Sequence, residues 1–220
     1  INGFFNIFDI SKNNRIKKFI YASTSSIYGI QKKYPLREKF ITDNPIQLYA
    51  ATKKSNEVIA ASYSHLYNMS TIGLRFFTVY GPWGRPDMAL FKFTDLIVKD
   101  NPIRVFNHGK MIRDFTYIDD VTEAVYLLIK KCLENKKGDE DFENKNLYKI
   151  FNIGNSQPTN LEDYIKAIEL NLNKKAKIIL EDMQPGDVQA TYANTESLEK
   201  YINFKPNTSI NVGIKNFIKW

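Results

Sequence analysis

The alternation of apolar strands with longer helical patterns constrains this chain most strongly. Phe19–Ala22 is predicted to be a buried strand, residues 48–67 a long helix, and Thr71–Phe77 a second buried strand. Parallel strands need such crossover helices, so the pattern indicates an α/β fold with a doubly wound parallel sheet. The side of the long helix that faces the sheet is predicted to carry Val58, Ile59, Ser62 and Leu66.

The remaining chain continues this pattern with shorter elements. Further helices are predicted at residues 1–11, 88–98, 120–133, 195–202 and 210–220, and one begins after residue 159. Further strands are predicted at 103–106, 111–118, 148–153 and 176–180. Residues 30–46, 78–86 and 134–147 are predicted to be loops, the last a charged surface loop. Capping boxes are predicted at Asp120–Glu123 and Thr159–Glu162.

Composition excludes several classes of protein. No stretch of these 220 residues approaches the roughly 20 apolar residues of a membrane span. The net charge of +7 comes from scattered lysines that match no nucleic-acid-binding signature, so no nucleic-acid partner is expected. Two histidines and one cysteine give no metal site. Cys132 is predicted to be a buried apolar residue, and a chain with a single cysteine suits the cytoplasm.

Only one of four Tyr-x-x-x-Lys pairs has a context that suits catalysis. Tyr28 is followed by Gly29 and a loop, Tyr126 lies in an apolar run and looks like core, and Tyr201 lies where a helix should end. The pair Tyr49 and Lys53 lies instead in the opening turns of a long helix, directly after a loop. A side chain there can face a cleft.

The spacing of Tyr49 and Lys53 explains what they could do chemically. Residues four apart on a helix are neighbours, and an ammonium about 5 Å from a phenolate stabilises it by roughly 3 kcal/mol at an effective dielectric of about 20. That lowers a phenol pKa of about 10 by roughly two units, toward the range of a general base. Thr24, at the end of the first strand, adds a hydroxyl that can both donate and accept.

Several motifs resemble one enzyme family. The stretches Ser23–Gly29, Tyr49–Lys53 and Leu74–Pro82 resemble the extended short-chain dehydrogenase/reductase family of sugar-nucleotide enzymes. Trp83–Phe91 and Arg113–Asp120 resemble its NAD-dependent epimerases, and most closely the UDP-glucuronate 4-epimerase type. The resemblance implies a Rossmann-type sheet with NAD as cofactor, a smaller mixed α/β lobe for a UDP-sugar, and a place in polysaccharide biosynthesis.

The resemblance covers only the later part of such an enzyme. The chain contains no Gly-rich strand-turn-helix of the kind that binds a dinucleotide pyrophosphate. We therefore expect a fragment that lacks roughly a hundred residues of the Rossmann domain, with an independent domain as the alternative. Residues 1–80, with 107–135 and 148–155, are expected to form the partial Rossmann domain, and 81–106 with 156–220 the substrate lobe.

The resemblance also assigns residues to ligands. It implies a catalytic set of Thr24, Tyr49 and Lys53. It places the cofactor against Ala22, Ser23, Tyr49, Lys53 and Phe77. It places the substrate against Thr24, Ser25, Ser26, Thr78, Arg85, Asn107, Arg113, Gln184 and Asp187.

The substrate assignments differ in how much they specify. Arg113 is expected on the phosphates, with a surface pair to Asp114 as the alternative. Asp187 is expected on the ribose hydroxyls, with a simple turn as the alternative. Gln184 stands where galactose-type epimerases carry arginine.

Residues Ser25 and Ser26 bear on the reaction. Related 4,6-dehydratases and decarboxylases carry acids in this stretch, so hydroxyls here favour epimerisation at C4. Serine-rich stretches can also simply satisfy backbone groups in turns. Another sugar-nucleotide epimerase, a UDP-glucuronate decarboxylase and a non-catalytic UDP-sugar-binding fragment remain alternatives. The resemblance further implies a homodimer formed through residues 48–67.

Overall fold

The computed structural model describes residues 1–134 and 147–220. Most of the charged loop predicted at 134–147 therefore lies outside the described residues. None of the described helices is long and apolar enough to cross a membrane.

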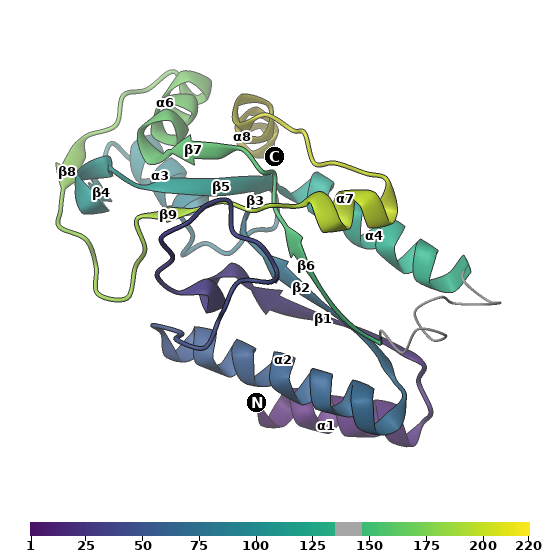
Figure 1. The fold of residues 1–220 in the computed structure, drawn as a ribbon. Coiled ribbons are helices and arrows are strands. Elements are labelled where there is room, and N and C mark those ends of the chain that lie inside the picture. Colours follow the sequence, from purple (N-terminus) through teal and green to yellow (C-terminus); the bar gives the residue numbers. More distant parts are fainter. Residues whose placement is uncertain (135–146) are drawn as a thin grey trace.

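The first part of the fold is a three-stranded parallel sheet with helices on both faces (Figure 1). Its order is β1 (Lys18–Thr24), β2 (Ser70–Phe76) and β6 (Tyr148–Ile153). Helices α1 (Asn2–Asn13) and α2 (Leu48–Tyr67) cover one face, and α4 (Ile118–Glu134) and α7 (Glu196–Ile202) cover the other. The predicted α/β class with a Rossmann-type parallel sheet is confirmed.

The second part of the fold is a smaller mixed lobe. Its main sheet has the order β3 (Thr78–Tyr80), β5 (Ile112–Tyr117) and β7 (Pro158–Asn160), with β9 (Ala190–Thr191) also paired to β5. A separate pair joins β4 (Ile103–Val105) to β8 (Ile178–Leu180). Helices α3 (Ala89–Val98), α6 (Leu161–Leu172) and α8 (Ile210–Lys219) complete the lobe.

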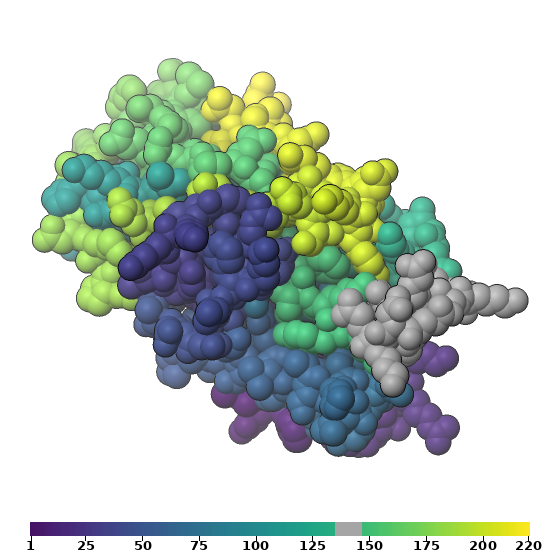
Figure 2. Space-filling model, viewed as in Figure 1, coloured from purple at the N-terminus to yellow at the C-terminus, as the bar shows by residue number. Residues whose placement is uncertain are grey.

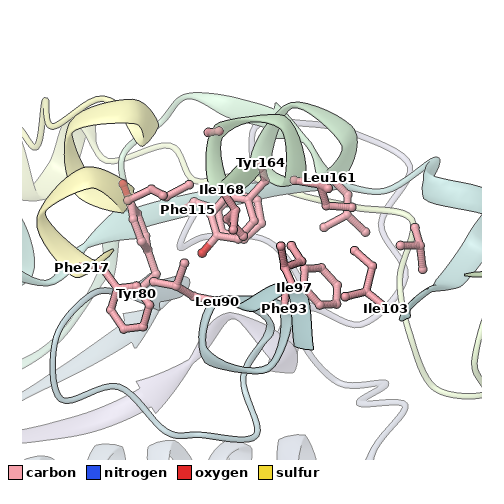
Figure 3. Packing of buried hydrophobic residues seen from close by; sticks show 14 of the residues in the cluster. Tyr80, Leu90, Phe93, Ile97, Ile103, Phe115, Leu161, Tyr164, Ile168 and Phe217 are labelled. Atoms are coloured by element: carbon pink, nitrogen blue, oxygen red, sulfur yellow. The ribbon is translucent and has the colours of Figure 1, made fainter. Parts of the chain in front are cut away.

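The lobe has its own apolar core (Figure 3). The rings of Phe115 and Tyr164 stack with centroids 3.9 Å apart, and Phe217 reaches the same cluster from α8. Burying such aromatic rings contributes both apolar area and favourable ring geometry. This packing fixes β5, and with it the position of Arg113.

The buried face of α2 differs from the prediction. Val58 and Leu66 are 57% and 64% exposed, whereas Glu57 and Ala60 face the sheet. The prediction was wrong because it assumed that the apolar side of the helix is the buried one. Here the buried side carries polar groups whose partners come from distant strands, as described below.

Several local predictions also need correction. Thr78–Tyr80 forms strand β3 rather than loop, and Tyr126 is exposed rather than core. Neither predicted capping box forms, because Asp120 instead accepts the N–H of Thr208 and the N-cap residue Asn160 makes no side-chain cap bond. Cys132 is buried, as predicted.

The predicted loop at residues 30–46 packs against the C-terminal part of the chain. Leu36 N–H donates to the Tyr192 carbonyl, and Asn194 N–H donates back to the Leu36 carbonyl. Figure 2 shows this dark-coloured segment filling the space between helix α2 and the yellow-green C-terminal residues. The loop is thereby held at the carboxyl ends of the parallel strands.

Candidate active site

An open cleft lies where the parallel sheet meets the smaller lobe, with an empty volume of about 510 Å³. Its wall combines the 3-10 turn η1 (Ser25–Tyr28), the two residues before α2, strands β3 and β5, and β9 with the segment before it. The lining residues are Ser25, Ser26, Gly29, Ile46, Gln47, Thr78, Arg113, Gly186, Asp187, Val188 and Thr191. Five predicted substrate residues are therefore brought together: Ser25, Ser26, Thr78, Arg113 and Asp187.

An ion pair forms one wall of the cleft. Arg113 Nη2 lies 2.7 Å from Asp187 Oδ1, and Arg113 Nη1 donates to the backbone carbonyls of Ile112 and Gln189. Burial lowers the pKa of Arg113, and the carboxylate of Asp187 opposes that effect. The guanidinium is thus held at a fixed place beside the cleft.

The alternative pairing of Arg113 with Asp114 is wrong. Asp114 is fully buried on the opposite face of β5 and accepts the backbone N–H groups of Ala193, Asn155 and Ser156. Burial raises the pKa of Asp114, and those three donors act against the rise. This carboxylate ties the segment after β9 to the sheet.

The predicted catalytic residues lie around the end of β1. Tyr49 is 53% exposed in the first turn of α2, and Lys53 Nζ lies 6.0 Å from the centre of its ring. Lys53 also donates to the carbonyl of Ala22 at 3.1 Å, which holds the helix start against the strand end. The phenol is therefore free to meet a ligand, with an ammonium beside it.

Thr24 terminates β1 and shapes the turn that follows. Its Oγ1 accepts the N–H of Ser26 and donates to Ser26 Oγ, both at 3.2 Å. Side chains of this stretch thus satisfy local backbone groups, which is the alternative role considered for them in the sequence. Ser25 and Ser26 nevertheless line the cleft.

Two predicted cofactor contacts have other roles in the structure. Ser23 is buried and donates to Glu57 Oε1 at 2.6 Å, and Phe77 is buried against Tyr28 and Leu36. Alternation along β1 explains the first case, because Ala22 and Thr24 point to one side of the sheet and Ser23 to the other. The Ser23 and Phe77 side chains thus point into the protein, while Ala22 is exposed.

Four predicted substrate residues stand outside the cleft lining, and one of them is Thr24, described above. Arg85 is exposed and binds the carboxylate of Asp87 through Nε and Nη2. Asn107 lies in the turn η2 (Phe106–Gly109), where its side chain donates to the carbonyl of Lys110. Gln184 is exposed in the loop before Asp187.

Sequence reasoning missed residues that close the cleft. Gln47 Nε2 donates to the carbonyl of Gly186 at 2.6 Å, joining the start of α2 to the loop that carries Asp187. Tyr34 lies close enough to Arg113 for the guanidinium to lower its pKa, although burial raises that pKa more strongly. Gln47 could have been suspected from its place one residue before the predicted helix, but Tyr34 gave no signal.

The described residues contain no group of three or more histidine, cysteine or acidic side chains placed to hold a metal ion. Hydroxyls, one ion pair and a Tyr-x-x-x-Lys helix are thus the chemical groups gathered here.

A parallel sheet whose strand ends meet such a helix is the arrangement of a short-chain dehydrogenase/reductase-type protein. Residues 1–154 match the NAD dependent epimerase/dehydratase family, and the chain belongs to this family. The family membership predicted from the motifs is confirmed.

Individual relatives are similar along the whole chain. Protein CapI of Staphylococcus aureus is 52% identical, over all of this chain and 67% of that protein. A probable UDP-glucuronate 4-epimerase of Rhizobium meliloti is 42% identical, over 99% of this chain and 66% of that protein. The crystal structure of the UDP-glucuronic acid 4-epimerase from Bacillus cereus, in complex with UDP-glucuronic acid and NAD, superposes with a TM-score of 0.84 at 30% identity. That comparison covers 96% of this chain and 63% of the other.

Proposed function

We propose that this protein takes part in NAD-dependent epimerisation at C4 of a UDP-sugar, converting UDP-glucuronate to UDP-galacturonate through a transient 4-keto sugar. The observation that carries the proposal is the cleft itself, which gathers Arg113, Asp187 and the hydroxyls of Ser25, Ser26 and Thr78 around the turn that follows β1. Lys53 donates to the Ala22 carbonyl near the end of the same strand, and its ammonium lies 6.0 Å from the Tyr49 ring. The names of the relatives from Rhizobium meliloti and Bacillus cereus support the choice of sugar.

The residues at the end of β1 fit the nicotinamide end of NAD. Lys53 uses one of its three N–H donors on the Ala22 carbonyl, so two remain for ribose hydroxyls. NAD, when bound, accepts a hydride from C4 of the sugar and returns it. The phenol of Tyr49 is exposed, so it is free to exchange a proton with the C4 hydroxyl of the sugar.

Proton transfer then falls to the side chains. Tyr49, as phenolate beside the Lys53 ammonium, removes the proton of the C4 hydroxyl. Thr24 rotates its O–H from Ser26 Oγ toward the sugar oxygen and stabilises it. When hydride returns to the other face of the keto sugar, Tyr49 gives the proton back.

Epimerisation needs a firm hold on the nucleotide and a loose hold on the sugar, because the sugar must turn over between the two hydride steps. Arg113 offers charge-assisted bonds to the diphosphate, and Asp187 can accept from the ribose hydroxyls. Short hydroxyl side chains at Ser25, Ser26 and Thr78 can bond a C6 carboxylate from either orientation.

The cleft favours epimerisation over decarboxylation. Among the described residues that line it, Asp187 is the sole acid, and that carboxylate is paired with Arg113. An elimination or decarboxylation that uses an acid after Thr24 has no such group available at Ser25 or Ser26.

The test is turnover of UDP-glucuronate by the protein as its native gene encodes it. We expect UDP-galacturonate without release of carbon dioxide. Tyr49→Phe should nearly abolish turnover and keep UDP binding, whereas Tyr126→Phe, at an exposed tyrosine of another Tyr-x-x-x-Lys pair, should leave both unchanged. Carbon dioxide release would indicate the decarboxylase, and UDP binding without NAD binding would indicate a non-catalytic UDP-sugar-binding protein.

We also infer that two copies associate through α1 and α2, which lie side by side (Figure 1). Both helices leave large apolar side chains in solvent, namely Phe5, Ile7, Ile10, Val58 and Leu66. Exposed apolar side chains on two neighbouring helices suit an association site. For the cellular compartment, we propose the cytoplasm, since a chain with a single cysteine suits a reducing environment.

A further inference from the structure

A buried ion pair lies beneath the Tyr-x-x-x-Lys helix. Glu57 of α2 and Arg75 of β2 are 2% and 4% exposed, and they bond through two parallel contacts of 3.0 and 2.9 Å. Ser23 of β1 adds a bond to Glu57 Oε1, and Arg75 Nη1 donates to Tyr28 Oη. The pair therefore joins α2, which carries Tyr49, to β2, and the Ser23 bond joins it to β1, which ends in Thr24.

The position of Glu57 in the helix gives this pair an electrostatic consequence. Tyr49, Lys53 and Glu57 are spaced four residues apart, so they share one helical stripe. Two helical intervals of four residues place Glu57 about 12 Å from Tyr49 along the axis. An uncompensated carboxylate there would act against the Lys53 ammonium, which has no carboxylate partner among the described residues.

The other charged and titratable groups near these side chains come from several elements. Glu57 is faced by Arg75 from β2, by Tyr21 from β1 and by Tyr148 from β6. Tyr49 is faced by Lys53 on its own helix and by Arg85 from the loop after β3. Arg85 is itself neutralised by Asp87. Arg75 is thus the cation in contact with Glu57.

We propose that Arg75 is a positioning residue that neutralises Glu57, so that the Lys53 ammonium acts on the Tyr49 phenol without a competing buried anion. The same two-bond contact fixes the stripe of α2 against β2, and the Ser23 bond fixes it against β1. The inference rests on the proposed role of Tyr49 as the base. A merely structural ion pair would stabilise the fold without influencing how Tyr49 ionises.

Charge-changing variants separate the two roles by the sign of their effect. Glu57→Gln leaves the Arg75 cation unpaired and should lower the pH at which Tyr49 ionises by up to about one unit, for a charge about 12 Å away at an effective dielectric of about 20. Arg75→Gln leaves the Glu57 carboxylate unpaired and should raise the pH at which Tyr49 ionises. The rise should be smaller, because an unpaired buried carboxyl takes up a proton more readily. The double variant Glu57→Gln/Arg75→Gln should return to the wild-type midpoint.

The readout is the ultraviolet difference absorbance between each protein and its Tyr49→Phe derivative across pH, which reports tyrosinate at this one position without cofactor or substrate. The pH profile of turnover is the second readout, and Ser23→Ala, which removes a neutral bond from the same network, is the uncharged control.

Opposite shifts in the two single variants with recovery in the double variant support the proposal. Unchanged midpoints in the single variants overturn it. If neither single variant folds, a double variant that departs from wild type by more than about half a pH unit overturns it as well. The absorbance measurement needs no turnover. A failure of the proposed epimerase function can therefore be told apart from a failure of this proposal.

Discussion

Replacing Arg113 with glutamine tests the phosphate side of the cleft directly. The Arg113 side chain is 16% exposed, and its Nη1 group is committed to the carbonyls of Ile112 and Gln189. Its Nη2 group bonds Asp187 and also contacts Met111 Sδ at 3.9 Å, so a diphosphate would meet Nε and would compete with that weak sulfur contact at Nη2. Arg113→Gln removes the charge while keeping a polar side chain of similar length.

The expected loss follows from the bonds available. A hydrogen bond to a charged group contributes about 1.5–3 kcal/mol. Asp187 already neutralises part of the guanidinium charge, so we expect the lower end, about 1.5–2 kcal/mol, or about 10- to 30-fold weaker UDP binding. Uridine lacks phosphates, and its affinity should change less than about twofold.

Calorimetric titration with UDP and with uridine, at one fixed ionic strength, measures both effects. Arg104→Gln is the matched control, because Arg104 is exposed, pairs with Glu181 and lies outside the cleft lining. It should change UDP binding less than about twofold. If Arg113→Gln weakens UDP no more than this control, the guanidinium does not bind phosphate. If uridine weakens as much as UDP, Arg113 instead supports the loop that carries Asp187.

Two further predictions concern packing and association. Gly213→Ala should destabilise the fold by about 1–3 kcal/mol in a denaturant titration, because a Cβ there would lie 2.2 Å from the buried Tyr80 hydroxyl. Gly3→Ala, where nothing lies within 4 Å, should be neutral or slightly stabilising, and an equal loss in both variants would contradict the packing argument. Val58→Lys with Leu66→Lys should shift the protein toward monomer in sedimentation at unchanged helix content, since two charges would enter the proposed α2 interface. The control Leu170→Lys, at an exposed position of α6, should leave the mass unchanged, and an unaltered mass in the double variant would argue against that interface.

The order of elements could be predicted because most strands and helices here are long enough to show a recognisable pattern of apolar residues in the sequence. Strands β1, β2 and β6 are apolar runs separated by turn signals, which is typical of interior parallel strands. Among the two- and three-residue strands, β4 and β8 were predicted from short apolar runs, whereas β3, β7 and β9 carry no such signal. They form because β5, which packs on the lobe core, offers them an open edge.

Residues of the cleft were predicted where they belong to a sequence motif, and they were missed where only the tertiary fold brings them there. Arg113 and Asp187, 74 positions apart, were assigned by resemblance, and they meet at 2.7 Å. Gln47 was missed because its role depends on where the carbonyl of Gly186 lies. The cofactor contacts of Ser23 and Phe77 stay a prediction, although alternation along β1 turns the Ser23 side chain toward Glu57.

Helix α2 shows why its buried face could not be predicted from hydrophobicity. A periodicity argument assigns burial to Val58 and Leu66, because it counts apolar side chains as the ones removed from water. The structure buries Glu57 instead, since Arg75 and Ser23 supply the bonds that make burying a carboxylate affordable. Burying the ion pair against the sheet therefore leaves the apolar face of the same helix exposed. Because the polar stripe faces the sheet, Lys53 is held at the end of β1, and the apolar stripe stays exposed, where we propose that a second copy binds.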